Sequence, residues 1–234
     1  MIDFIDAYDA KARLAPALVT AAPGAMALGI LASTESLGGA QWGAGICALG
    51  LAVLATAIAR DRGKALEPRL YAKWGGKPTS VILRNSDTTI DPLLKTRYRL
   101  NLEKIVPGFK APSPQEELRD ASAADRRYDM ATRFLIERTT DRAKFPKVFA
   151  HNCGYGFRRN LLGLKPYGIS SSMLAIAIGL WLLKVSAVPA FVSLAFGAGV
   201  TGLFVFCLIV NQDFVRRSAF DYAIHLVAAS DSLA

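Results

Sequence analysis

The segment from Val188 to Val210 has the sequence VPAFVSLAFGAGVTGLFVFCLIV and contains no Asp, Glu, Lys, Arg or His. At a rise of about 1.5 Å per residue, a helix of this length crosses a hydrocarbon core of about 30 Å. The segment therefore predicts a membrane-spanning helix.

A second uncharged stretch, residues 167–183, precedes it, and only Lys184-Val185-Ser186-Ala187 lies between the two. A connection this short allows only a tight reversal, so the pair predicts an antiparallel hairpin. The alternative is a buried helical pair in a soluble protein, but such a pair rarely runs this far without a polar stripe.

Two further uncharged stretches lie near the start of the chain, at residues 14–32 and 37–59, and the second ends at Arg60-Asp61-Arg62. They predict a first hairpin. Pro16 and Pro23 predict a bend, which a membrane helix tolerates only where neighbouring groups satisfy the freed carbonyl oxygens.

The first 13 residues carry aspartates at helical spacing and predict a short amphipathic helix near the membrane surface. Lys11 and Arg13, followed by Ala25-Met26-Ala27, also fit a signal peptide with a cleavage site. We favour the interpretation in which the segment is retained.

Lys and Arg are concentrated in the middle of the chain. Of 28 basic residues, 23 lie from Arg60 to Lys165, where they face only 12 Asp and Glu, and Lys184 alone falls in a loop on the opposite side. The positive-inside rule then places the middle segment and both termini in the cytoplasm.

These observations predict an all-α membrane protein with four transmembrane helices in two hairpins and a mostly helical cytoplasmic domain inserted between them. The expected segments are an amphipathic segment (1–13), hairpin 1 (14–60), the basic domain (61–165), hairpin 2 (166–210) and a cytoplasmic C-terminal helix (211–234).

Local signals in the basic domain are mostly helical. Gly75-Gly76-Lys77-Pro78 predicts a break, residues 79–83 predict one short strand, and Asp91-Pro92 predicts a capped helix start. Ser113-Pro114-Gln115-Glu116 has capping-box spacing, and residues 146–162 predict a last helix. The helix that begins at Ser113 is expected to bury one apolar face: Ala124, Tyr128, Ala131 and Leu135.

Catalytic, metal and cofactor motifs are not predicted. The sequence lacks GxxxxGK[ST], HExxH, GxSxG and CxxC, and its three cysteines are scattered. Gly75-Gly76-Lys77-Pro78-Thr79 resembles part of a phosphate loop, but Pro78 removes an amide donor and favours a turn. His151 and Cys153, two residues apart on a helix, do not face one another, which favours a surface histidine beside a buried cysteine.

Residues 152–156, Asn-Cys-Gly-Tyr-Gly, resemble the TVGYG filter of potassium channels. The filter threonine is replaced by Asn152, and the string lies beside Arg158 and Arg159 on the expected cytoplasmic side. A filter needs a re-entrant loop between two spans, so we favour a loosened or kinked helix.

Within the spans the prominent signal is helix packing. Small residues at four-residue spacing predict that helices approach closely, either within the chain or between subunits of a homo-oligomer. Any pore would be lined by these residues. Proton-coupled or ion-coupled transport is disfavoured because the predicted spans contain no Asp, Glu, His or Arg. The small residues are Ala21, Ala25 and Gly29; Ala44, Ala48, Ala52 and Thr56; and Ser193, Gly197 and Thr201.

The basic surplus has three interpretations. Residues beside the spans match anionic lipid head groups, a solvated surface accounts for others, and residues farther from the spans predict a site for an anionic ligand. The ligand-binding residues expected are Arg84, Lys95, Arg97, Arg99, Arg126, Arg127, Arg133, Arg158 and Arg159.

In layout, two hairpins around a basic domain, the chain resembles compact transmembrane effectors of bacterial nucleotide-signalled anti-phage defence systems. The inserted basic domain, its charge and the small-residue ridges predict an oligomeric membrane effector or ion channel gated by an anionic nucleotide or oligonucleotide, and the resemblance implies a role at the bacterial inner membrane in antiviral defence. No cofactor and no enzymatic activity are expected. The alternative is a non-conducting scaffold that docks an acidic protein partner. A membrane enzyme is disfavoured because no catalytic set stands out.

Overall fold

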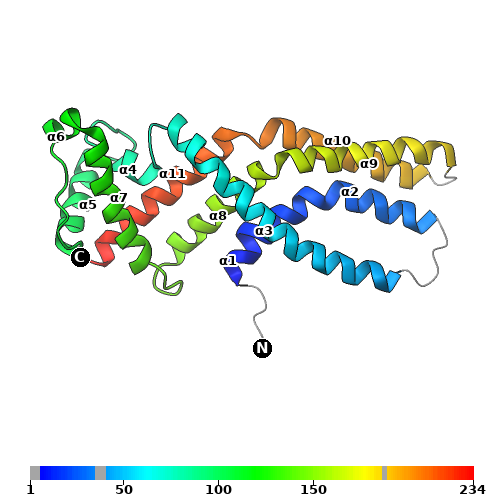
Figure 1. Cartoon of the computed structure of the whole chain (residues 1–234), viewed down its shortest axis with the longest axis horizontal. Coiled ribbons are helices and arrows are strands. Elements are labelled where there is room, and N and C mark those ends of the chain that lie inside the picture. Colours follow the sequence, from blue (N-terminus) through cyan, green and yellow to red (C-terminus); the bar gives the residue numbers. More distant parts are fainter. Residues whose placement is uncertain (1–5, 35–40, 186–188) are drawn as a thin grey trace. The chain divides into compact units, whose positions relative to one another are not determined.

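The computed structural model describes residues 6–34, 41–185 and 189–234, and it describes the side chains of residues 6–32, 54–184 and 189–234. All regular secondary structure of these residues is helical (Figure 1). The chain forms two structural units: unit 1 comprises Met1–Glu67 and Gly156–Val215, and unit 2 comprises Pro68–Tyr155 and Arg216–Ala234. The boundaries fall inside α3, α8 and α11, so each of these helices contains residues of both units.

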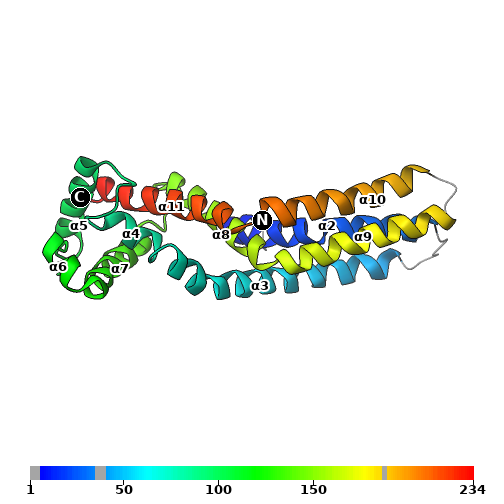
Figure 2. The same cartoon turned by 90° about the horizontal axis from the view of Figure 1, so that it is seen from above.

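Unit 1 contains the apolar helices. It consists of α1 (Ala7–Asp9), η1 (Ala10–Leu14), α2 (Ala15–Thr34), most of α3 (Gln41–Lys73), the end of α8 (Pro146–Gly163), α9 (Lys165–Val185), α10 (Pro189–Phe204), η2 (Val205–Ile209) and the start of α11 (Gln212–Ala228). Within the unit, α2, α9 and α10 run side by side (Figures 1 and 2).

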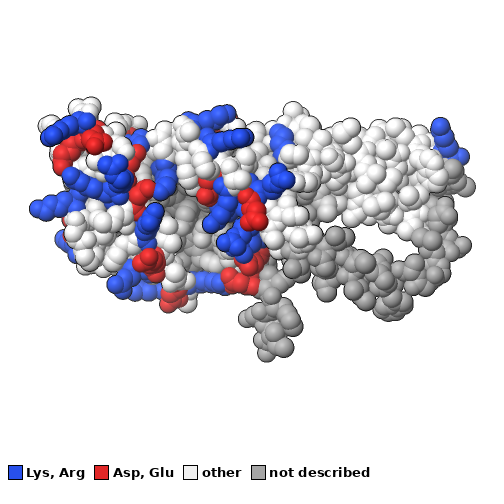
Figure 3. Space-filling view, in the orientation of Figure 1, with Lys and Arg blue, Asp and Glu red and all other residues white. Residues whose placement is uncertain are grey.

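Three helical segments are long and apolar enough to cross a membrane: Ala7–Ala32, Lys165–Lys184 and Pro189–Ile209. Three of the four predicted spans are therefore confirmed as candidate spans. On the face shown in Figure 3, α9 and α10 are almost free of charged side chains. The predicted span 37–59 is helical from Gln41, but its residues 37–40 and the side chains of 41–53 lie outside the described part, as do residues 1–5 of the predicted amphipathic segment.

Pro16 explains the irregular start of the first candidate span. Because proline has no N–H, the carbonyl oxygen of Ala12, four residues earlier, loses its α-helical donor. The chain is wound as a π-helix over Ala10–Leu14, and Asn160 of α8 donates from Nδ2 to the Ala12 oxygen at 2.6 Å. This is the compensation from a neighbouring helix that the prolines were predicted to need.

Glycines set the spacing between α9 and α10. A Cβ at Gly199 would lie 2.7 Å from the carbonyl oxygen of Ser172, and a Cβ at Gly202 would lie closer still to the Ser172 hydroxyl. Any larger residue at these positions forces the helices apart. Gly197, in contrast, has no atom within 4 Å of a built Cβ.

Unit 2 is a helical bundle with its own core. It contains the end of α3, α4 (Pro78–Leu83), α5 (Pro92–Ile105), α6 (Pro114–Arg119), α7 (Ala121–Arg138), most of α8, most of α11 and η3 (Ala229–Ser232). Its largest fully buried side chains are those of Tyr128, Ile82, Leu83, Leu102, Leu135, Leu226 and Val227.

The caps predicted for unit 2 are confirmed. Asp91 accepts hydrogen bonds from the backbone N–H groups of Leu93 and Leu94, and Ser113 and Glu116 form a reciprocal capping box. The four residues predicted to form the apolar face after Ser113 are all buried. The turn at Gly75 and Gly76 is also confirmed, because both have positive φ angles, of 79° and 146°.

Two predictions for unit 2 are wrong. Residues 79–83 form helix α4 rather than a strand, because Pro78 starts the helix at its first position and five of its six residues are buried. Tertiary burial overrides the strand preference of its β-branched residues. The helix expected from Ser113 onward is two helices, because Asp120 adopts φ −149° between them and caps α7 by accepting from the Ala123 N–H at 2.8 Å.

Candidate functional site

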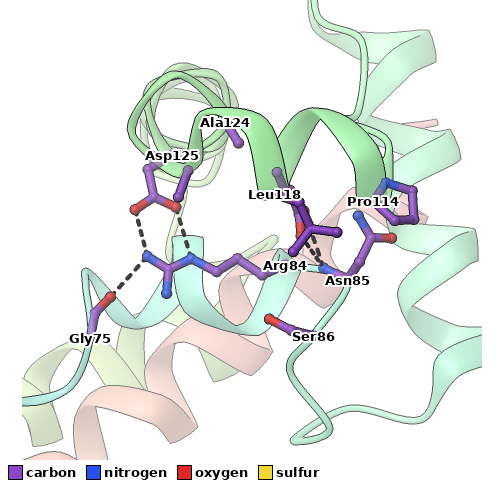
Figure 4. Close-up of a pocket in the computed structure, with 10 residues that line it drawn as sticks. Gly75, Arg84, Asn85, Ser86, Pro114, Leu118, Ala124 and Asp125 are labelled. Carbon is purple, nitrogen blue, oxygen red and sulfur yellow. Dashed lines mark hydrogen bonds and ion pairs between the residues drawn. The ribbon is translucent and has the colours of Figure 1, made fainter.

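A pocket of about 790 Å³ lies in unit 2 between the loop after α4, helix α6 and the start of α7 (Figure 4). Arg84 at the end of α4 supplies its cationic group, and Glu117 and Asp125 supply its carboxylates. Pro114 and the side chain of Leu118, 88% exposed, form an apolar edge.

The guanidinium of Arg84 is held by the protein itself. Nε donates to one Asp125 oxygen at 2.9 Å, and Nη2 donates to the other at 2.5 Å and to the Gly75 carbonyl oxygen at 2.8 Å (Figure 4). The Asp125 hydrogen bonds raise the pKa of Arg84 further above its ordinary value. Such a bidentate pair is among the stronger hydrogen-bonded contacts in proteins.

The loop that follows Arg84 is fixed by Glu117 and its partners. Both Glu117 oxygens accept from the Asn85 N–H, at 3.1 and 2.9 Å, and Oε1 also accepts from the Tyr128 hydroxyl at 2.7 Å. Burial, followed by this hydrogen bond, raises the pKa of Tyr128 well above its usual range. Tyr128 therefore stays neutral and keeps donating.

Two further cations stabilise the same loop from inside. Lys95 is only 6% exposed, and its Nζ donates to the carbonyl oxygens of Arg84, at 2.8 Å, and of Asp87. Burial lowers the pKa of Lys95 from its ordinary value. Arg99 donates to Asn85 Oδ1 and to the Pro112 carbonyl oxygen.

The charges that line this pocket disfavour an anion. One guanidinium meets two carboxylates, and Asp87 adds a third negative charge near Arg84. An incoming phosphate would have to compete with Asp125 for the same donors. Arg84, Lys95 and Arg99, three of the predicted ligand residues, are therefore engaged in hydrogen bonds within unit 2.

Four other predicted ligand residues are likewise engaged inside their own units. Arg97 pairs with Asp231 at 2.6 Å, and Arg127 pairs with Glu116 at 2.8 Å, both in unit 2. In unit 1, Arg158 lies over the Phe214 ring at 4.8 Å. Also in unit 1, Arg159 pairs with Glu67 and donates twice to Asn160 Oδ1 at 3.1 Å.

The remaining two, Arg126 and Arg133, form the Arg126–Arg133 groove of α7. Both side chains are exposed, and they border a hollow of about 450 Å³ together with Met130, Phe134 and Glu137. Arg126 donates to Ser122 at 2.8 Å, and within the described part of the chain neither guanidinium has an ion-pair partner. Seven residues apart, they share a helix face about 10 Å apart along the axis.

Two carboxylates border this groove, and that of Asp129 is already engaged elsewhere. Asp129 also borders it, but accepts hydrogen bonds from Lys77 Nζ and, at 2.8 Å, from the Ser80 hydroxyl of α4. Asp129 is therefore engaged by Lys77 and Ser80 and not by the two arginines. Glu137 contributes one negative charge to the groove, against the two positive charges of Arg126 and Arg133.

Histidine pairing is a feature that the sequence analysis missed. The spacing of His151 and Cys153 draws attention to these two residues as a pair. In the structure the His151 ring, on α8, instead stacks on the ring of His225, on α11. No spacing signal connects two residues 74 positions apart. Residues 152–156, which resemble a potassium filter, lie within the continuous helix α8 and do not form a loop.

Six of the residues predicted to pack helices together are exposed, whereas the glycines that pack α10 against α9, Gly199 and Gly202, are buried. Ser193, Gly197 and Thr201 are exposed and line an apolar groove of about 590 Å³ between α2 and α10. Ala21, Ala25 and Gly29 of α2 are exposed as well. The side chains of Ala44, Ala48 and Ala52 lie outside the described residues.

Within the described residues, no group of three or more His, Cys, Asp or Glu side chains is placed to hold a metal ion. No protein-family model matches the chain, and no significant match was found among curated proteins or solved structures.

Proposed function

We propose that the chain is an oligomeric inner-membrane effector or channel whose unit 2 binds an anionic ligand, a nucleotide or oligonucleotide, in the Arg126–Arg133 groove of α7. The observation that carries the proposal is the difference between these two arginines and the other seven predicted ligand residues. Those seven form ion pairs, backbone or amide hydrogen bonds, or ring contacts within the protein. Arg126 and Arg133 are exposed in one hollow and have no ion-pair partner in the described part of the chain, and Arg126 donates only to the Ser122 hydroxyl.

The proposed membrane arrangement adds a fourth span, residues 37–59, to the three candidate spans, giving two hairpins. Unit 2 and both termini face the cytoplasm, since Lys184 is the one basic residue in the loops expected outside. Exposed small residues on α2 and α10 support contact between subunits.

Ligand binding reaches the spans through chain connectivity. Helices α3, α8 and α11 each contain residues of both units. A ligand that binds one arrangement of unit 2 more tightly than another shifts the population toward it, by no more than its difference in affinity. The three shared helices carry that shift to the membrane segments.

The test uses the full chain reconstituted in liposomes, with ion flux and ligand binding measured across a panel of nucleotides and short oligonucleotides. Each arginine supplies a hydrogen bond to a charged group, worth about 1.5–3 kcal/mol. Arg126→Glu with Arg133→Glu should therefore weaken binding by about 100-fold or more and abolish ligand-dependent flux.

The matched control carries the same change of charge on exposed lysines outside the groove, Lys104→Glu with Lys110→Glu. It should bind within about twofold of the parent protein, apart from a general salt-dependent loss. Equal loss in both double variants would show only a nonspecific charge effect, and absence of flux with every ligand would refute the channel.

The second candidate is a non-conducting scaffold that docks an acidic protein partner. It is favoured by large apolar side chains on the surface of unit 2, since Leu93 is 82% exposed and Leu118 is 88% exposed. A stoichiometric partner that co-purifies and is lost with Leu93→Ser or Leu118→Ser, without any ligand-dependent flux, would establish this function instead.

A further inference from the structure

Helices α8 and α11 bring together the only two histidines of the chain. The rings of His151 and His225 are stacked, with centroids 3.6 Å apart and planes inclined by 16°. A second stack lies beside it on the same two helices, where the rings of Tyr155 and Tyr222 are nearly parallel with centroids 6.3 Å apart. Both ring pairs join α8 to α11 within unit 2.

The hydrogen bonding of His225 defines where its first proton lies. Its Nδ1 is 2.8 Å from the carbonyl oxygen of Asp221, and because a carbonyl oxygen can only accept, Nδ1 carries a hydrogen. Any additional proton on this ring goes to Nε2. Protonation of both rings would place two positive charges face to face at stacking distance.

The surrounding charges do not cancel that repulsion. Burial and then His225 lower the pKa of His151, whereas Asp221 acts in the opposite direction and more weakly. On α8 itself, Lys147 stands one turn before His151 and adds a positive charge. One turn after it stands Tyr155, whose hydroxyl is 3.2 Å from that of Tyr71 on α3.

We propose that the His151–His225 stack is a pH-sensitive clasp between α8 and α11. With no more than one proton added to the pair, the rings stay stacked and the helices stay joined; with a proton added to each, the two imidazolium rings repel and the contact opens. The clasp is distinct from the Arg126–Arg133 groove and acts without its ligand. Opening of the clasp would make the contact between α8 and α11 depend on pH. Both helices also contain residues of unit 1.

The pair can be observed directly, because a protein with two histidines has two imidazole signals. In the full chain in detergent micelles, labelled with ¹³C-histidine, we expect two titration steps separated by about one pH unit or more, equivalent to at least a tenfold difference in proton affinity. In His225→Phe the charge is lost but a ring remains, so the pKa of His151 should rise toward its ordinary value. Two coincident, independent titrations, or a His151 pKa unchanged in His225→Phe, would overturn the proposal.

Thermal unfolding gives a second measurement that a merely structural stack would not move. A group whose folded-state pKa is depressed stabilises the fold above its unfolded-state pKa, near 6.5, and this stabilisation is lost as pH falls below that value. The melting temperature of the parent protein should fall between pH 7 and pH 5, and His151→Phe with His225→Phe should remove this fall while keeping two stacked rings. A fall that persists unchanged in the double variant would refute the clasp.

Discussion

Asn160→Ala tests how the protein tolerates a proline at the start of its first candidate span. The Asn160 side chain is fully buried; its Nδ2 donates to the Ala12 oxygen, and its Oδ1 accepts twice from Arg159. Truncation removes the Asn160 donor of the buried Ala12 oxygen, which costs about 1–3 kcal/mol, and also removes one of the acceptors of Arg159, which keeps its ion pair with Glu67. We expect a total loss of about 2–4 kcal/mol in the free energy of unfolding.

Pro16→Ala separates the two contributions. Alanine at position 16 supplies the N–H that the Ala12 oxygen lacks, so Asn160→Ala should cost about 1–2 kcal/mol less in this background. The four proteins of the cycle are compared by reversible unfolding in mixed micelles with increasing dodecyl sulfate, followed by tryptophan fluorescence. Asn152→Ala, on the same helix, is the control and should show no coupling to Pro16→Ala. If Asn160→Ala costs the same in both backgrounds, within about 0.3 kcal/mol, the amide does not compensate for the proline.

Three further predictions concern single side chains. Gly199→Ala should lower stability by about 1–3 kcal/mol because its Cβ meets the Ser172 backbone, whereas Gly197→Ala, two residues earlier in α10, should leave the melting temperature unchanged or slightly raised. Tyr128→Phe should cost about 1–2 kcal/mol in denaturant unfolding, since Glu117 loses the donor at 2.7 Å; no change would mean that the hydroxyl contributes nothing. The capping box lowers the pKa of Glu116 to about 2. The Glu116 carboxylate therefore stabilises the fold fully above its unfolded-state pKa of 4.5, and this stabilisation is lost as the pH falls toward 2. A ¹³C titration of the Glu116 carboxyl group with a midpoint near 4.5 would contradict this prediction.

Features that depend on neighbours in the sequence were predictable. The spans predicted at 14–32, 167–183 and 188–210 follow from length and hydropathy alone. The candidate spans of the structure contain the first two and match the third to within one residue at each end. The Asp91 cap and the Ser113–Glu116 capping box follow from residue types at fixed spacing, because cap and capped N–H groups lie within one turn.

Features that depend on residues distant in the sequence were not predictable. Strand preference at residues 79–83 was overruled by burial against the core of unit 2. The periodicity of Ser193, Gly197 and Thr201 correctly identified a shared face, but Gly199 and Gly202 are the glycines that meet α9. Periodicity shows which residues lie together on a helix and does not show which face meets a neighbour.

By itself, the sequence determined the helical class, the apolar segments, the helix caps and the concentration of positive charge between residues 60 and 165. Only the tertiary structure decided that Arg84 is held by Asp125, that Asn160 donates to the Ala12 oxygen in place of the N–H that Pro16 lacks, and that the two histidines meet. The reason is geometric: hydropathy and capping act over one or two turns, whereas an ion pair or a ring stack joins residues tens of positions apart, and no local pattern records which partner the fold brings close.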